Sequence, residues 1–313
     1  MTTQAAVQAT VAQPRIGAGL WRDAWGRLRK NRLAILGLIL VLGLLFVGVF
    51  GPMIAPYPYS AQDLQAVRAG GGGPLPPGSP GHLLGTDQLG RDLLSRLLDG
   101  ARISVSVAIV VQIVILLIGV PIGAMAGWFG GRTDNVLMRF TDIIYAFPDL
   151  LFIILLSVVF RETLFGQALD GLLLVFIAIG LTSWVTVARL VRGQVLALKE
   201  TEFVEAAKAI GVPERKIVTR HLLPNGIGPI IVAVTLGIPG AILAEATLAY
   251  IGVGVHPPRA SWGSLIAEGQ KYVRSEPHLV LFPAIAIALA LVSFTFLGDG
   301  LRDALDPKLK GKQ

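Results

Sequence analysis

The sequence predicts an all-α polytopic membrane protein with six transmembrane helices and both termini in the cytoplasm. Three observations predict this class. Hydrophobic residues make up 53% of the chain and charged residues only 15%, whereas roughly 25% of the residues in soluble domains are charged. The apolar residues occur in long uninterrupted blocks, and the basic residues collect in every second segment between those blocks.

Six blocks are long and apolar enough to cross a hydrocarbon core about 30 Å thick, at about 1.5 Å per helical residue. They are residues 34–54, 103–128, 143–160, 172–191, 227–251 and 279–297. The first block is too long for the core of a signal peptide, so we expect a retained anchor. Pro148 and Asp149 interrupt the third block, and Arg189 lies near the end of the fourth.

The distribution of basic residues predicts the orientation. Nineteen of the 27 Lys and Arg residues lie in 1–33, 129–142, 189–225 and 298–313, and eight lie in the alternate segments. Because cytoplasmic loops carry the excess of Lys and Arg, both termini and 189–225 are expected in the cytoplasm, with an extracytoplasmic loop at 55–102. The net charge of +7 then reflects membrane topology, and we expect no nucleic-acid partner.

The cytoplasmic N-terminal segment 1–33 has two parts. Residues 1–18 show no structural pattern. From Gly19, the residues Trp21, Trp25 and Leu28 share one helical face, surrounded by arginine and lysine. This pattern is typical of a helix lying in the lipid headgroup layer, and equally of a basic flank that orients the following span.

The loop 55–102 contains a glycine- and proline-rich tract at 69–80. No Gly-Lys-Ser/Thr follows Gly70–Gly73, so the tract indicates a flexible linker and not a phosphate-binding loop. A leucine stripe then predicts an amphipathic helix that leads into the second span. The stripe consists of Leu93, Leu94, Leu97 and Leu98.

The segment 201–225 is a polar island between the fourth and fifth spans, and it predicts a helix, a tight turn and a second helix. Thr201 is placed to cap the first helix. Gly211 occupies the position where a helix end favours a left-handed residue, and Pro213 suits the start of the next helix. We expect that second helix to end at Pro224. A small apolar face is predicted on the first helix, formed by Phe203, Ala206, Ala207 and Ile210.

A DNA-binding helix-turn-helix would show the same order of helix, glycine turn and basic helix. The two flanking spans argue against that alternative, because they would hold the unit against a bilayer.

Glu245 is the one acidic residue well inside a long apolar block. It lies 21 residues beyond Pro224, or about 31 Å along a helix, which is close to the outer surface. We therefore expect a structural or gating ion pair near the outer mouth, with Arg102 as partner. Contact with substrate or a proton is the alternative, because ionisable groups within spans are functional candidates.

The sequence offers no site for catalysis, a metal or a cofactor. Its four histidines, His82, His221, His256 and His278, are scattered, and it has no cysteine. It also lacks a P-loop and a Gly-x-Ser-x-Gly elbow. If ATP drives the function, another chain must hydrolyse it.

Several motifs resemble those of a known family. Glu205-Ala206-Ala207, Gly211 and Leu223-Pro224 resemble the EAA loop of ABC importer permeases. That loop prefers isoleucine where this chain has His221, and the sequence His-Leu-Leu-Pro-Asn is similar to the peptide and nickel branch. The same branch is resembled at Gly85-Thr86-Asp87, Gly90-Arg91-Asp92, Ser95-Arg96, Leu248–Gly254, Ser261-Trp262-Gly263 and Gly298–Lys308.

The resemblance implies the second permease of a dipeptide, oligopeptide or nickel importer, with a type I core at 103–297 and a cytoplasmic tail at 298–313. It implies a multi-pass protein of a prokaryotic inner membrane. The implied partners are a homologous permease, two ABC ATPase subunits that bind ATP and Mg, and an extracytoplasmic solute-binding protein. The implied ATPase-coupling residues are Glu205, Ala206, Ala207, Gly211, Leu223 and Pro224.

Other functions are kept as alternatives. Nickel chelates and glutathione share this permease architecture with peptides. The alternative outside the ATP-driven transporters is a secondary transporter, driven by an ion gradient through Glu245. The segment 201–225 would have no role in such a transporter. A membrane-embedded enzyme would need paired acids or metal ligands at one depth, which the sequence does not offer.

Overall fold

The computed structural model describes residues 20–306, and helices build most of this part of the chain. The predicted patternless segment 1–18 and the last seven residues of the C-terminal tail lie outside it. Five of its helices are long and apolar enough to cross a membrane. They confirm five of the six predicted blocks: α2 (Arg32–Ile54), α4 (Leu93–Phe129), α8 (Leu172–Leu198), α12 (Ile227–Tyr250) and α14 (His278–Leu305).

The third predicted span is not one straight helix. It consists of α5 (Gly131–Ala146) and α6 (Asp149–Phe160), which are bent by 82° at the break between them. Phe147 has an extended backbone, with ψ of 135°, because a following proline disfavours the helical conformation. Pro148 therefore divides the block, and the described residues hold six membrane crossings if the bent pair counts as one.

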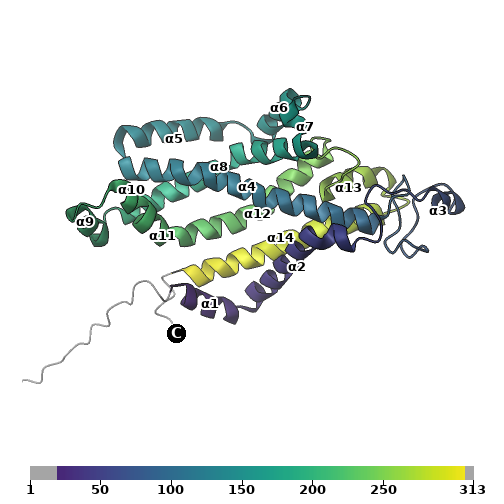
Figure 1. Cartoon of the computed structure of the whole chain (residues 1–313), viewed down its shortest axis with the longest axis horizontal. Coiled ribbons are helices and arrows are strands. Elements are labelled where there is room, and N and C mark those ends of the chain that lie inside the picture. The colour runs from purple at the N-terminus through teal and green to yellow at the C-terminus, as the bar shows by residue number, and fades with distance from the viewer. Residues whose placement is uncertain (1–19, 307–313) are drawn as a thin grey trace, which may run out of the picture.

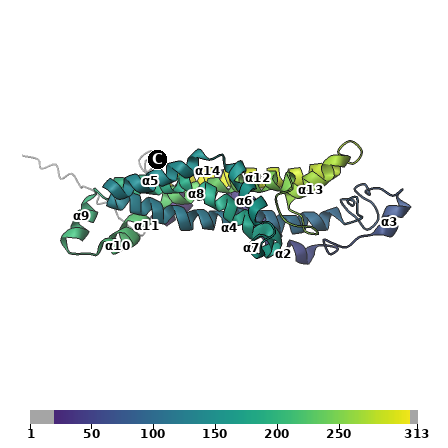
Figure 2. The ribbon, with the colours of Figure 1, turned by 90° about the horizontal axis from the view of Figure 1, so that it is seen from above.

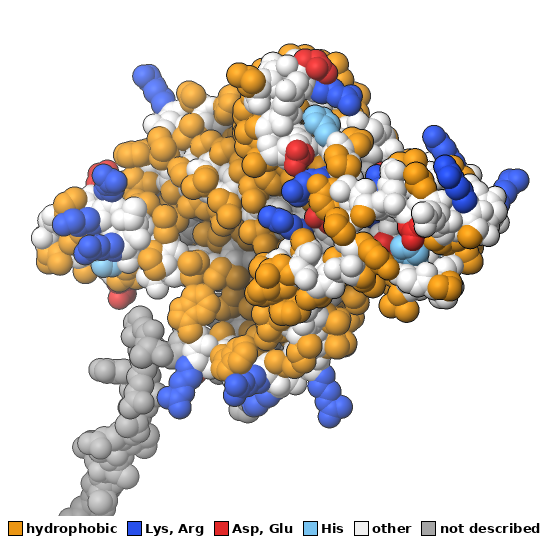
Figure 3. Space-filling view, turned by 45° about the vertical axis from the view of Figure 1, so that its right-hand side comes forward, with side chains coloured by type: hydrophobic (Ala, Val, Ile, Leu, Met, Phe, Trp, Pro, Cys, Tyr) orange, Lys and Arg blue, Asp and Glu red, His pale blue; other side chains and the backbone are white. Residues whose placement is uncertain are grey.

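The molecule is elongated, and its connecting segments gather at two opposite ends (Figures 1 and 2). One end carries α9 (Glu202–Ala209), α10 (Glu214–Lys216) and α11 (Leu223–Asn225). The other end carries α3 (Leu64–Ala69), the loop that contains it and α13 (Trp262–Gly269). Hydrophobic side chains cover most of the middle of the face shown in Figure 3, and most Lys and Arg side chains lie around its edges.

The main core is built around the contact between α4 and α8. Gly119, Gly123 and Gly127 form a stripe of period four on α4, where added Cβ atoms would collide with α8. A Cβ on Gly123 would lie 2.3 Å from the carbonyl oxygen of Ala188. Small residues therefore let the two backbones approach closely, as is common between membrane helices.

The helix α1 (Leu20–Lys30) packs against the end of α14. Ala24 and Leu28 are buried there, whereas Trp21 and Trp25 are 56% and 43% exposed. Of the three residues predicted to share one face, Leu28 is buried against α14, whereas the indoles of Trp21 and Trp25 are exposed. The Arg29 guanidinium lies 4.8 Å from the ring centre of Trp25, which gives α1 a basic aromatic outer surface suited to a lipid headgroup layer.

The first loop is fixed by hydrogen bonds and buried charges. Asp63 caps α3 by accepting from the Ala66 amide at 2.8 Å, and this bond holds the pKa of Asp63 below its usual value. Asp92 caps α4 by accepting from the Ser95 amide at 2.8 Å. The glycine-rich tract forms turns, in which Gly71 and Gly72 have positive φ.

A network of four charged side chains joins this loop to α13. Asp87 accepts from Arg91 and from Arg96, each at 2.6 Å. Arg91 and Arg96 also contact Glu268 of α13, at 2.9 and 2.6 Å. The side chains of Arg91, Arg96 and Asp87 are at most 7% exposed, so the Gly-Arg-Asp region braces the N-terminal end of α4.

Candidate functional site

The helix–turn–helix segment 201–225 forms one tip of the molecule (Figures 1 and 2). Its first helix, α9, ends as the sequence predicts. Gly211 is left-handed, with φ of 75°, and the Val212 amide donates to the Ala207 carbonyl at 3.0 Å. This bonding pattern is the Schellman motif, which requires a left-handed residue at that position. Thr201 precedes α9, but its hydroxyl donates to the Leu198 carbonyl and does not cap the helix.

The structure divides the predicted apolar face of α9. Ala207 is buried beneath the helix together with Val204. Phe203, Ala206 and Ile210 are exposed, and Ile210 is 81% exposed. We call these three residues the docking face. Glu205 lies exposed on the same helix.

The second half of the segment is less regular than predicted. Pro213 precedes α10, and a π-helix over Ile217–Leu222 leads into α11. The helical run that begins at Glu214 ends at Asn225, one residue after the predicted end at Pro224.

Buried apolar residues attach this second half to the core. Ile217 and Leu222 are at most 1% exposed and belong to the same core as α4 and α8. Leu223 packs partly against that core, whereas Pro224 is exposed. The six predicted coupling residues thus share one tip, but Ala207 and Leu223 face inward and the others face outward.

Polar contacts attach the tip to the neighbouring helices. The Trp128 indole at the end of α4 donates to Glu214 at 3.0 Å, and the Lys208 ammonium lies 5.2 Å from the centre of its ring. Nearby, Arg192 of α8 forms a two-bond pair with Asp134 of α5, at 2.5 and 2.6 Å. These contacts join the tip, α4, α5 and α8 into one unit.

The predicted ion pair between Glu245 and Arg102 is wrong. Glu245 is 2% exposed and accepts from the Ser104 hydroxyl at 3.2 Å. Arg102 is exposed, and within residues 20–306 no ion pair joins it to Glu245. Residues two apart on a helix point in nearly opposite directions, so α4 turns Ser104 toward Glu245 and Arg102 away from it.

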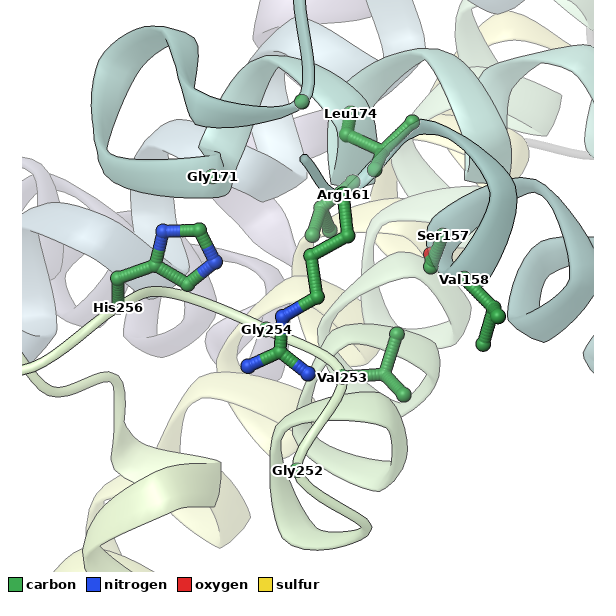
Figure 4. Close-up of a pocket in the computed structure, with 11 residues that line it drawn as sticks. Ser157, Val158, Arg161, Gly171, Leu174, Gly252, Val253, Gly254 and His256 are labelled. Atoms are coloured by element: carbon green, nitrogen blue, oxygen red, sulfur yellow. The ribbon is translucent and has the colours of Figure 1, made fainter. Parts of the chain in front are cut away.

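A polar pocket at the opposite end was missed by the sequence analysis (Figure 4). It lies between the end of α6, the start of α8 and the segment 252–256, and it contains Ser157, Arg161 and His256. The only indication of this pocket in the sequence is that Ser157 and Arg161 are four residues apart, which places them on one helical face. Within the described chain, no group of three or more Asp, Glu or His residues is placed to hold a metal.

Comparison with protein families identifies the chain. Residues 119–311 match the model described as the binding-protein-dependent transport system inner membrane component. The chain belongs to this family of inner membrane components. Residues 19–77 of this permease also match the N-terminal TM domain of oligopeptide transport permease C. Family membership and its apolar helices make it a multi-pass inner-membrane protein and a transport subunit.

Individual relatives agree with the family. The permease is 42% identical to the oligopeptide transport system permease protein OppC of Bacillus subtilis, over 93% of this chain and 90% of that protein. It is 43% identical to the dipeptide transport system permease protein DppC of Bacillus subtilis, covering 92% and 86%. It is 35% identical to the glutathione transport system permease protein GsiD of Pectobacterium atrosepticum, covering 93% and 92%.

A solved structure shares the fold. A chain of the MetNI methionine ABC transporter, in an inward-facing conformation, superposes with a TM-score of 0.55. It is 17% identical, and the match covers 66% of this permease and 94% of that chain. The predicted type I ABC permease fold is therefore confirmed.

Proposed function

We propose that this permease forms half of the membrane pathway of an ATP-driven peptide importer. A homologous permease would supply the other half, two ABC ATPase subunits the energy, and an extracytoplasmic solute-binding protein the substrate. The names of the relatives support peptides as the substrate class, because oligopeptides, dipeptides and the tripeptide glutathione all belong to it.

The docking face at the tip carries this proposal. Phe203 and Ile210 are large apolar residues, 41% and 81% exposed, on a short helix that protrudes from the rest of the molecule (Figure 1). Full burial of such a side chain contributes about 1.5–3 kcal/mol. Burial of both residues in a groove on an ATPase subunit would therefore contribute enough binding free energy to hold the tip firmly.

The attachment of the tip suggests how movement is transmitted. The tip is joined to α4 through Trp128 and Glu214, and its second half is embedded in the core through Ile217 and Leu222. When ATP closes the ATPase pair, the tip would move with its ATPase and carry α4, α5 and α8 along as a rigid body. The pathway would then switch between inward and outward openings.

A surface-charge substitution tests the docking face. Ala206→Arg places a long cation in the centre of the face, and Ala61→Arg makes the same change at an exposed alanine near the other end. We expect Ala206→Arg to abolish co-purification of the ATPase subunits and uptake, with normal membrane insertion. We expect Ala61→Arg to leave both unchanged. Normal ATPase binding by Ala206→Arg would contradict the proposal.

The proposal includes the orientation with both termini and the tip in the cytoplasm, supported by the distribution of Lys and Arg. The chain has no cysteine, so single cysteines report the side directly. Gln65→Cys in α3 and Ala209→Cys in α9 are both at exposed positions. In spheroplasts, a membrane-impermeant maleimide should label Gln65→Cys at once, and Ala209→Cys only after permeabilisation. The reverse result would overturn the orientation.

A further inference from the structure

The pocket near the end of α6 is small, and polar and apolar residues both line it. Its volume is about 40 Å³, which is room for about three waters or one carboxylate group. Four glycines, Gly166, Gly171, Gly252 and Gly254, form part of its wall. Figure 4 shows the Arg161 side chain extending toward the segment 252–254, with the His256 ring beside it.

Ser157 contributes a buried polar group without a partner. The residue is 7% exposed, and its hydroxyl makes no hydrogen bond to any described residue. Leaving a buried hydroxyl unpaired costs about 1–3 kcal/mol, so such a group indicates a missing ligand or water. Ser157 is one helical turn before Arg161 on α6, which directs both side chains to the same side.

Arg161 and His256 contribute the donors. Arg161 is exposed, and its guanidinium has no hydrogen bond or ion pair with the described residues. The His256 backbone is held by its amide, which donates to the Asp170 carbonyl at 2.9 Å. The imidazole of His256 lies directly beside Gly171, where an added Cβ would be 3.3 Å from the ring.

The start of α8 adds a positive field to the same pocket. Gly171 precedes this 27-residue helix, and no side chain caps it. A helix N-terminus favours anions because its first amides and the helix dipole are positive. The preceding Leu169 and Asp170 are left-handed, with φ of 55° and 59°, a costly conformation that often marks a functional site.

We propose that this pocket binds the terminal carboxylate of a peptide in transit. Arg161 and His256 would donate to the carboxylate oxygens, and Ser157 would add its hydroxyl. Both Arg161 and His256 also line a wider depression of about 410 Å³, which has room for the peptide chain. Two acids, Glu162 and Asp170, line this depression as well, and Asp170 is paired with Arg259 at 3.1 Å. This inference rests on the proposed function, since it names the part of the peptide that the permease recognises.

Uptake by the complete transporter in liposomes, supplied with its solute-binding protein, tests the inference. The probes are Ala-Phe-Ala and its C-terminal amide, each at a concentration that saturates the binding protein. We expect Arg161→Met to lower uptake of the free acid about tenfold or more, as for loss of a hydrogen bond to a charged group. Uptake of the amide should change less than about twofold.

Two further variants guard against a purely structural effect. Arg274→Met removes an exposed arginine outside the pocket and should leave both uptakes unchanged. Ser157→Ala removes an unpaired hydroxyl, so it should fold normally and still lower uptake of the free acid. Equal loss of both peptides in Arg161→Met, or normal uptake of the free acid, overturns the carboxylate site alone. A wild-type transporter that imports neither peptide overturns the proposed function as well.

Discussion

The indole Nε1 of Trp128 donates to the Glu214 carboxylate at 3.0 Å, although 86 residues separate them. Trp128 lies in the last turn of α4 and Glu214 begins α10. The hydrogen bond therefore connects the tip, formed by residues 201–225, to α4. It offers a direct route by which movement of the tip would reach the opposite end of the molecule.

Removing this hydrogen bond should weaken coupling without preventing assembly. Trp128→Phe loses the donor and weakens the contact with Lys208, at a cost of about 1 kcal/mol. We expect the ATPase subunits to bind and hydrolyse ATP, and the amount of peptide imported per ATP to fall. Glu214→Gln keeps an acceptor oxygen and should have a smaller effect. Unchanged stoichiometry in both variants would show that the contact transmits nothing.

The turn glycine Gly211 should be needed for the shape of the tip. Its φ of 75° costs a residue with a Cβ about 1 kcal/mol. We expect Gly211→Val, with its branched side chain, to reduce the fraction of permease that retains ATPase subunits on purification. Gly193→Ala is the control, because Gly193 is helical and an added Cβ would meet nothing within 4 Å. Equal retention in wild type and Gly211→Val would contradict this prediction.

The buried network at the other end should dominate the stability of the first loop. The Arg96 side chain is 1% exposed and contacts both Asp87 and Glu268. Breaking a buried ion pair by removing one partner typically costs about 3–5 kcal/mol. We expect Arg96→Met to lower the thermal unfolding temperature in detergent and to expose the loop to protease.

Arg68→Met is the matched control for the buried network, since Arg68 is exposed on α3. It should unfold and resist protease like the wild type. If Arg96→Met is as stable as Arg68→Met, the network does not stabilise the first loop.

Much of this architecture follows from the sequence because bilayer thickness and backbone chemistry leave few options. Uninterrupted apolar blocks gave the positions of α2, α4, α8, α12 and α14, and Gly211 gave the end of α9. Pro148, which interrupts the third block in the sequence, marks the break between α5 and α6. The burial of Ala207 was not predictable, because it depends on which side of a helix meets its neighbours, and uniformly apolar spans do not encode that rotation.

The polar sites show the same limit. Glu245 was recognisable as an unusual acid, but its partner depended on the rotation of α4, which presents Ser104 and turns Arg102 away. The pocket around Arg161 combines residues from α6, α8 and the segment after α12, which lie far apart in the sequence. Only the packed fold brings Ser157, Arg161 and His256 together.

Glu245 provides the sharpest distinction between an ATP-driven permease and a transporter driven by an ion gradient. Its carboxylate accepts from Ser104 at 3.2 Å within the packed helices, and a glutamine has an oxygen that can accept the same bond. If ATP supplies the energy, Glu245→Gln should keep near wild-type peptide uptake, whereas Glu245→Leu should lower the yield of folded protein by leaving the hydroxyl proton of Ser104 without an acceptor.

A gradient-driven transporter makes the opposite prediction for Glu245→Gln, because an amide cannot take up and release a proton. Uptake measured in liposomes with and without an imposed proton gradient checks this directly. Loss of uptake in Glu245→Gln with normal folding, together with gradient dependence in the wild type, would assign the energy source to this carboxylate and remove the role proposed for the docking face. We expect uptake that follows ATP in both proteins, since the buried side chain of Glu245 hydrogen-bonds to Ser104 of α4 and would then serve only to join the two helices.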